Sequence, residues 1–78
     1  SVLNEKEVDI IFMDPPYGEG LEKKALEILS NASYVTEDTM IIIESDLKTD
    51  FEYVSELGFE IYREKTYKTN RHLFIKKQ

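Results

Sequence analysis

Two short apolar runs separated by an amphipathic segment dominate the first half of the chain. Residues 8–13 read Val-Asp-Ile-Ile-Phe-Met and residues 40–43 read Met-Ile-Ile-Ile. Runs that are apolar at nearly every position are typical of strands covered on both faces, as in a parallel sheet. Between them, apolar side chains recur at helical spacing, at Leu21, Ala25, Ile28, Leu29 and Ala32. The pattern predicts a strand, a helix ending at about Asn31 or Ala32, and a second strand, together a right-handed βαβ unit.

A short second helix is predicted just before the last glycine of the chain. Thr49 and Glu52 have the spacing of a capping box, in which each side chain bonds the other residue's backbone N–H. Gly58 suits the left-handed conformation that often follows a helix. The segment therefore predicts a helix that begins near Thr49 and ends at Gly58.

The remaining residues predict an antiparallel hairpin. Residues 59–66 and 72–76 are rich in β-branched and aromatic side chains, and the polar residues 68–70 lie between them. No internal repeat, low-complexity tract or linker divides the sequence. We therefore expect one α/β domain over residues 1–78, with the element order β-α-β-α-β-β.

The composition narrows the possible sites. The chain has no cysteine, which excludes disulfides and thiolate metal sites and fits a reducing, cytoplasmic location. His72 is the only histidine, so we expect it to pack on a strand or at the surface and expect no metal site. No apolar run approaches the length of a membrane span, so no membrane partner is expected.

The net charge of −6 argues against nucleic-acid binding through the overall field of this chain. The charge is unevenly distributed, however. From Ile61 onward six basic residues face one acid, whereas residues 1–60 carry roughly −11. This basic end either faces phosphate groups or consists of ordinary solvated hairpin charges.

The residues Asp14-Pro15-Pro16-Tyr17, directly after the first strand, carry the clearest chemical signal. Prolines lack N–H donors and fix φ, so the loop is rigid and rich in acceptors. Methyl transfer to an exocyclic base nitrogen needs such acceptors, because the nitrogen's lone pair is delocalised into the ring. The Asp14 carboxylate and the Pro15 carbonyl would hold the amino group, and Tyr17 would stack on the base. The alternative is an ordinary structural turn.

A second group of acids follows the second strand. Glu44 and Asp46 lie at its carboxyl end, and ligands of open α/β sheets bind outside the carboxyl ends of parallel strands. Direct contact with a substrate is one interpretation of these two acids. Solvation, or capping of the next turn, is the more ordinary one.

These residues resemble a known group of enzymes. Asp14-Pro15-Pro16-Tyr17 after an apolar strand is similar to motif IV of class I, S-adenosylmethionine-dependent amino-methyltransferases, and residues 8–21 with 25–29 most resemble the RsmD family. That family methylates the N2 amino group of a guanine in small-subunit ribosomal RNA. The resemblance implies that Asp14 and Pro15 bind the amino group, that Pro16 shapes the loop, and that Tyr17 packs on the guanine. It also implies that Asp14 lies beside the cofactor.

The resemblance covers only one half of such an enzyme. The three glycines, Gly18, Gly20 and Gly58, do not form the Gly-rich strand-to-helix turn that holds a cofactor. The chain is thus expected to be the substrate-facing C-terminal half of a Rossmann-like methyltransferase, inactive alone, with the main S-adenosylmethionine contacts elsewhere. Because it starts at Ser1 rather than at a methionine, we expect it to be part of a longer protein.

The resemblance also implies a topology. The four strands would form a mixed sheet in the order first, second, fourth, third, with the last strand antiparallel. Residues 8–13 would then be an exposed apolar edge, prone to pairing with another strand. We expect this edge to mediate self-association or to be covered by another segment.

Lys68 and Arg71, near the hairpin tip, are the residues expected to reach RNA phosphates. Two alternatives to the ribosomal RNA enzyme stay open: a DNA adenine-N6 methyltransferase, and a noncatalytic α/β interaction module. Asp14 and Tyr17 in a cleft at the carboxyl side of the sheet would favour an enzyme, whereas their burial in packing would favour the module.

Overall fold

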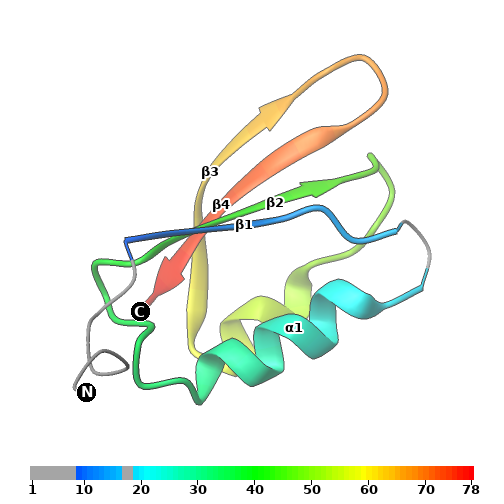
Figure 1. Ribbon diagram of the computed structural model, residues 1–78. Helices are drawn as coiled ribbons and strands as arrows, with labels where there is room; N and C mark the ends of the chain where they lie inside the picture. Colours follow the sequence, from blue (N-terminus) through cyan, green and yellow to red (C-terminus); the bar gives the residue numbers. More distant parts are fainter. Residues whose placement is uncertain (1–8, 17–18) are drawn as a thin grey trace.

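The computed structural model describes residues 9–16 and 19–78. The elements are β1 (Ile10–Met13), α1 (Leu21–Ser30), β2 (Met40–Ser45), the 3₁₀ helix η2 (Glu52–Leu57), β3 (Phe59–Thr66) and β4 (Arg71–Lys77) (Figure 1). This order confirms the expected β-α-β-α-β-β pattern. In the described part of the chain, no helix is long and apolar enough to cross a membrane.

The four strands form one mixed sheet in the order β1-β2-β4-β3. β1 pairs in parallel with β2, whereas β4 is antiparallel to both β2 and β3. The order and the antiparallel last strand agree with those implied by the resemblance. Because β1, β2 and β3 run in one direction, their carboxyl ends and the tip of the β3–β4 hairpin share one rim of the sheet (Figure 1).

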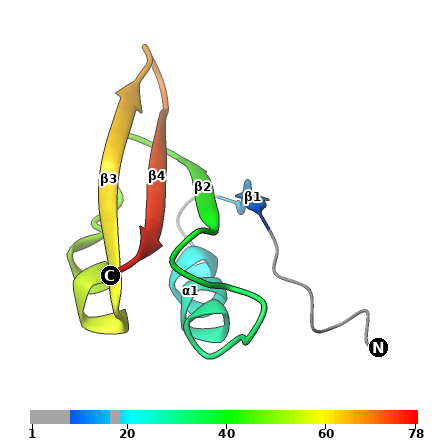
Figure 2. The ribbon, with the colours of Figure 1, turned by 90° about the vertical axis from the view of Figure 1, so that its left-hand side faces the viewer.

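Both helices pack on the same face of the sheet (Figure 2). Alternation along β2 sends Ile41 and Ile43 into this layer, where both are fully buried, and Leu26 and Leu29 meet them from α1. Burial of each such side chain contributes about 1.5–3 kcal/mol. The core, formed by apolar side chains from every element except β1, comprises Leu26, Leu29, Val35, Ile41, Ile43, Phe51, Val54, Phe59, Leu73 and Ile75.

The segment before η2 differs from the predicted capping box. The Thr49 hydroxyl donates to Asp46 Oδ1 at 2.7 Å, and Asp50 Oδ1 accepts from the Glu52 N–H at 2.8 Å. Phe51 occupies the N-cap without a side-chain hydrogen bond. The prediction was wrong because Asp46 competes for the Thr49 hydroxyl. Gly58 ends η2 as expected, with φ of 87°.

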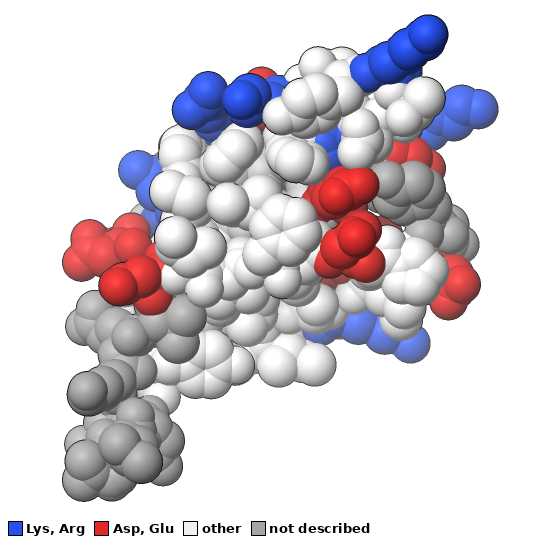
Figure 3. Space-filling model, turned by 45° about the horizontal axis from the view of Figure 1, so that its top comes forward, with Lys and Arg blue, Asp and Glu red and all other residues white. Residues whose placement is uncertain are grey.

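The opposite face of the sheet carries no helix among the described residues. Figure 3 shows an area without charge over this side of the molecule, bordered by both basic and acidic side chains. β1 lies at the edge, as predicted, and two of its apolar side chains, Ile10 and Phe12, are 59% and 56% exposed. The sheet therefore presents an apolar edge beside a face that no described helix covers.

Candidate functional site

The candidate site lies where β1 and β2 end side by side. The register pairs Met13 with Ile43; Asp14 directly follows β1, and Glu44 is the next residue of β2. Asp14 is exposed and Pro15 is half-buried, while Pro16 is exposed. Tyr17 lies outside the described residues. Asp14 is thus exposed at the rim and is not buried in packing, and burial would have favoured the noncatalytic module.

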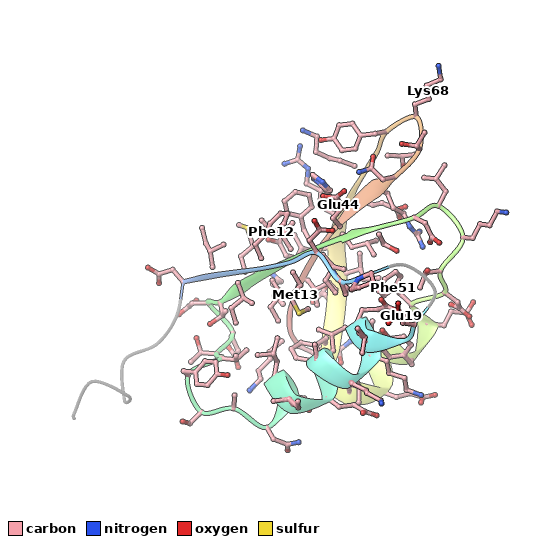
Figure 4. The ribbon with its side chains drawn as sticks, turned by 45° about the vertical axis from the view of Figure 1, so that its right-hand side comes forward. Phe12, Met13, Glu19, Glu44, Phe51 and Lys68 are labelled. Carbon is pink, nitrogen blue, oxygen red and sulfur yellow. The ribbon has the colours of Figure 1, made fainter. Side chains whose placement is uncertain are left out.

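Alternation decides which side chains share the open face with the site. In Figure 4, Phe12 and Glu44 lie on one side of the sheet, and Met13 points toward the helices. Met13 packs against the core cluster, whereas Phe12 stays exposed. Glu44 therefore stands at the carboxyl end of β2 on the face that no described helix covers.

Glu44 belongs to a polar and aromatic cluster that joins β2 to the hairpin. The Asn70 amide donates to Glu44 Oε2 at 2.9 Å, and His72 Nε2 lies 3.7 Å from Glu44 Oε1. The His72 ring packs edge-on against Tyr67 and Phe12, with centroid distances of 5.1 and 6.2 Å. We call Glu44, Asn70, His72, Tyr67 and Phe12 the rim cluster. His72 is thus a strand-packing histidine, as predicted.

Asp46 has the ordinary capping role considered for it. Its Oδ1 accepts hydrogen bonds from the Thr49 hydroxyl, the Thr49 N–H and the Lys48 N–H. The Thr49 hydroxyl contributes most to holding the pKa of Asp46 below its usual range, followed by the Thr49 backbone. Asp46 therefore shapes the loop after β2, and it is Glu44 that remains a candidate for substrate contact.

Arg71 has a structural role that the sequence did not reveal. Its Nε donates to the Asp46 carbonyl at 3.0 Å, Nη2 donates to the Thr49 carbonyl, and Nη1 lies 3.0 Å from Glu64 Oε2. The guanidinium also lies over the Phe51 ring, 5.4 Å from its centroid. The guanidinium donors of Arg71 are bound within the protein and its side chain is only 17% exposed. Arg71 is therefore poorly placed for the phosphate contact predicted for it.

Lys68, the other predicted phosphate contact, occupies the hairpin tip. It is exposed and points away from the sheet (Figure 4). The tip turn is closed by the Tyr67 N–H, which donates to the Asn70 carbonyl at 2.7 Å. Lys68 and Asp14 therefore share one rim, with the rim cluster between them.

The described residues outside this rim add little chemistry. No group of three or more potential metal ligands occurs among residues 9–16 and 19–78. A shallow groove of about 230 Å³ lies between η2 and β3, lined chiefly by Phe51, Val54, Phe59 and Ile61. It is at the opposite edge of the sheet from β1, far from Asp14.

Sequence reasoning named Asp14 and Glu44 from their strand ends but did not find the other members of the rim cluster. The missing signal was the register between β2 and β4, which pairs Glu44 with His72 and Ser45 with Arg71. Directly opposed residues of neighbouring strands lie within side-chain reach, so a known register would have placed His72 beside Glu44 and Arg71 beside the end of β2.

Two curated proteins are similar to this chain. Ribosomal RNA small subunit methyltransferase D of Buchnera aphidicola is 44% identical over 43 residues, which are 55% of this chain. The uncharacterized methylase RP545 of Rickettsia prowazekii is 31% identical over 74 residues, or 95% of the chain. The chain spans only 22% and 30% of the lengths of these relatives.

Solved structures share the fold. A conserved hypothetical protein from Streptococcus pyogenes superposes with a TM-score of 0.78 at 22% identity, over 94% of this chain and 45% of its own. A Haemophilus influenzae protein, provisionally assigned as a methylase, gives 0.77 at 20% identity, over 95% of this chain and 41% of its own. The family model described as conserved hypothetical protein 95 matches residues 1–76. The chain therefore belongs to the family of conserved hypothetical protein 95, the RsmD family whose motif it resembles.

Proposed function

We propose that this chain is the substrate-facing half of an S-adenosylmethionine-dependent methyltransferase that acts on the N2 amino group of a guanine in small-subunit ribosomal RNA. The observation that carries the proposal is the exposed Asp14 at the carboxyl end of β1, in a chain of the RsmD family. Its Buchnera relative is named as a methyltransferase of that RNA.

The chemistry of the site is positioning and electrostatic complementarity. The Asp14 carboxylate and the Pro15 carbonyl accept the N–H groups of the base, which directs the nitrogen toward the methyl carbon. Tyr17 stacks on the ring and limits its tilt. The amino group loses a proton during or after transfer, and Asp14 is not required to be the base that takes it.

The fit of the cofactor to this chain is partial. S-adenosylmethionine would supply an electrophilic methyl group, and the exposed carboxylate of Asp14 is compatible with a place beside it. The sequence contains no Gly-rich turn to hold the rest of the cofactor. In the intact protein, those contacts are assigned to other residues, and the chain alone is inactive.

Two surfaces near the candidate site are assigned to binding partners, the hairpin tip and the edge of β1. Lys68 at the hairpin tip is the cation best placed to meet an RNA phosphate near Asp14. The apolar edge of β1 pairs either with another segment of the intact protein or, in the isolated chain, with a second copy. We assign the protein to the cytoplasm, where ribosomal RNA is its substrate.

The test uses the intact protein and small-subunit ribosomal RNA that lacks the modification. Asp14→Ala and Tyr17→Ala are each expected to lower kcat/KM about a hundredfold or more, because each removes a contact to the reacting base. Glu56→Ala, an exposed acid on η2, is the matched control and should leave activity unchanged. Duplex DNA serves as a second methyl acceptor.

Three results would overturn the proposal. Full activity of both variants would remove Asp14 and Tyr17 from the site. Methylation of adenine in DNA, with none in the RNA, would assign the protein to the DNA adenine-N6 alternative. Methylation of neither acceptor by the unmodified protein would favour the noncatalytic module.

A further inference from the structure

Glu44 occupies a position beside Asp14 that the proposed function does not use. The parallel register ends at the pair Met13–Ile43; Asp14 is the first residue after β1, and Glu44 is the next residue of β2. Adjacent strands lie about 4.8 Å apart, so two carboxylates at their ends can reach neighbouring atoms of one planar base. The Glu44 side chain is 26% exposed, which leaves it accessible from the open face.

The hairpin orients Glu44 instead of leaving it solvated. Asn70 donates to Oε2 at 2.9 Å, and the His72 ring, packed against Tyr67, lies 3.7 Å from Oε1. A carboxylate accepts several hydrogen bonds at once, so these contacts fix its direction without preventing it from accepting another from a ligand. Asn70 and His72 act here as positioning residues.

Guanine and adenine present different hydrogen-bonding groups to the Asp14 and Glu44 carboxylates. Guanine presents the N1–H and N2–H₂ donors side by side. Adenine presents a donor at N6 and a lone pair at N1. Two adjacent carboxylates match the guanine edge, whereas a carboxylate facing adenine N1 would meet a second acceptor and leave it unpaired.

We propose that Glu44 is a specificity-determining residue that accepts the N1–H of the target guanine while Asp14 and Pro15 hold its N2 amino group. This inference rests on the proposed function and deepens it, because it gives the site a means to reject adenine. Discrimination of one base from another by such a contact is worth roughly tenfold to a hundredfold.

The experiment uses a base analogue that lacks the N1–H of guanine. The methylated guanosine is first mapped in ribosomal RNA, and a matched RNA then carries 2-aminopurine ribonucleotide there. 2-Aminopurine keeps the N2 amino group but has a lone pair at N1 and a hydrogen in place of O6, so it is the change of preference in Glu44→Gln that reports the N1–H contact. The intact protein should prefer guanosine by tenfold or more in kcat/KM, and Glu44→Gln should reduce this preference at least tenfold, mainly through lost activity on guanosine.

Two further variants separate recognition from structure. Asn70→Ala keeps the carboxylate but removes its donor, so it should shift the preference in the same direction by a smaller factor. Glu64→Gln loses the ion pair with Arg71 on the same hairpin and should lower activity on both RNAs equally, if at all. If Glu44 had only a structural role, Glu44→Gln would behave like Glu64→Gln and lower activity on both RNAs equally.

An unchanged preference in Glu44→Gln, with thermal melting showing a folded protein, would overturn the inference. So would equal activity of the unmodified protein on the two RNAs. Failure of the proposed function gives a different result, because the unmodified protein would then methylate neither the guanosine nor the 2-aminopurine RNA.

Discussion

Arg71 shows how one side chain can shape a site without touching the substrate. It extends from the first residue of β4 to the carbonyls of Asp46 and Thr49 and covers the Phe51 ring. The loop after β2 therefore has its conformation set from the neighbouring strand. Glu44 is two residues before the first of these carbonyls, so the same contacts fix the end of β2.

Replacing Arg71 should cost more stability than replacing any exposed cation of the hairpin. Arg71→Met leaves two loop carbonyls without their donor, and we expect a loss of about 2–4 kcal/mol in the free energy of unfolding. Arg71→Lys should be intermediate, because an ammonium cannot reproduce the planar set of donors. Urea denaturation of the intact protein measures both, with Lys68→Met as control. Equal losses for Arg71→Met and Lys68→Met would contradict this role.

Tyr53 carries the one buried side-chain polar atom in the described part of the chain that has no hydrogen-bond partner. Burial is the main cause that raises its pKa to about 12 from 10.0, and the nearby charge of Glu22 adds to it. The neutral phenol is thus favoured in the folded state. The stability linked to this raised pKa is fully present below pH 10 and is lost as the pH rises toward 12.

Tyr53→Phe should remove this part of the pH dependence. Below pH 10 the variant should equal or exceed the unmodified protein in stability, since it no longer buries an unpaired hydroxyl. Between pH 10 and 12 the free energy of unfolding of Tyr53→Phe should increasingly exceed that of the unmodified protein. Urea denaturation at pH 8, 10 and 11.5 gives the comparison, and a difference that stays constant over this range would rule out the titration of Tyr53 as its source.

At the scale of elements, the strands and α1 could be predicted because their apolar periodicity is strong. Residues 40–43 are apolar at every position, and helical spacing between Leu21 and Leu29 has no competing pattern. The start of η2 could not be predicted, because the Thr49 side chain could bond either the Glu52 backbone or Asp46. In the structure its hydroxyl donates to Asp46. The rim position of Asp14 followed from its strand end. The roles of Glu44 and Arg71 depended on a cross-strand register that no local pattern encodes.

Gly58 controls how η2 passes into β3. Its φ of 87° lies in the left-handed region, and an added Cβ would meet no atom within 4 Å. Gly58→Ala should therefore cost about 1–2 kcal/mol through backbone strain alone. Gly58→Asn should cost less, since asparagine tolerates this conformation. Thermal unfolding with Ser55→Ala as control tests the pair, and equal stability of the alanine and glycine proteins would show that the turn relaxes.

The whole molecule is a sheet with helices on one face and an apolar strand at one edge. Such an edge is a template for pairing with another strand. We predict that the isolated 78-residue chain self-associates through β1 and that Phe12→Lys, which adds a charge to that strand, lowers the association.

Sedimentation velocity over a range of concentrations measures this association. The matched control is Tyr62→Lys, which places the same charge on β3 at the opposite edge of the sheet. A stable monomer of the unmodified chain at all concentrations would refute the prediction, and an equal effect of the two lysines would assign the contact to another surface.

The position of β4 has a consequence for how the protein is made. β4 follows β3 in the sequence, yet it lies between β2 and β3 in the sheet. During synthesis on the ribosome, β1, α1 and β2 can assemble as soon as they emerge, but β3 has no neighbour to pair with until β4 follows it. The rim cluster and the Arg71 contacts therefore need β4, so the candidate site forms only after β4 has left the ribosome.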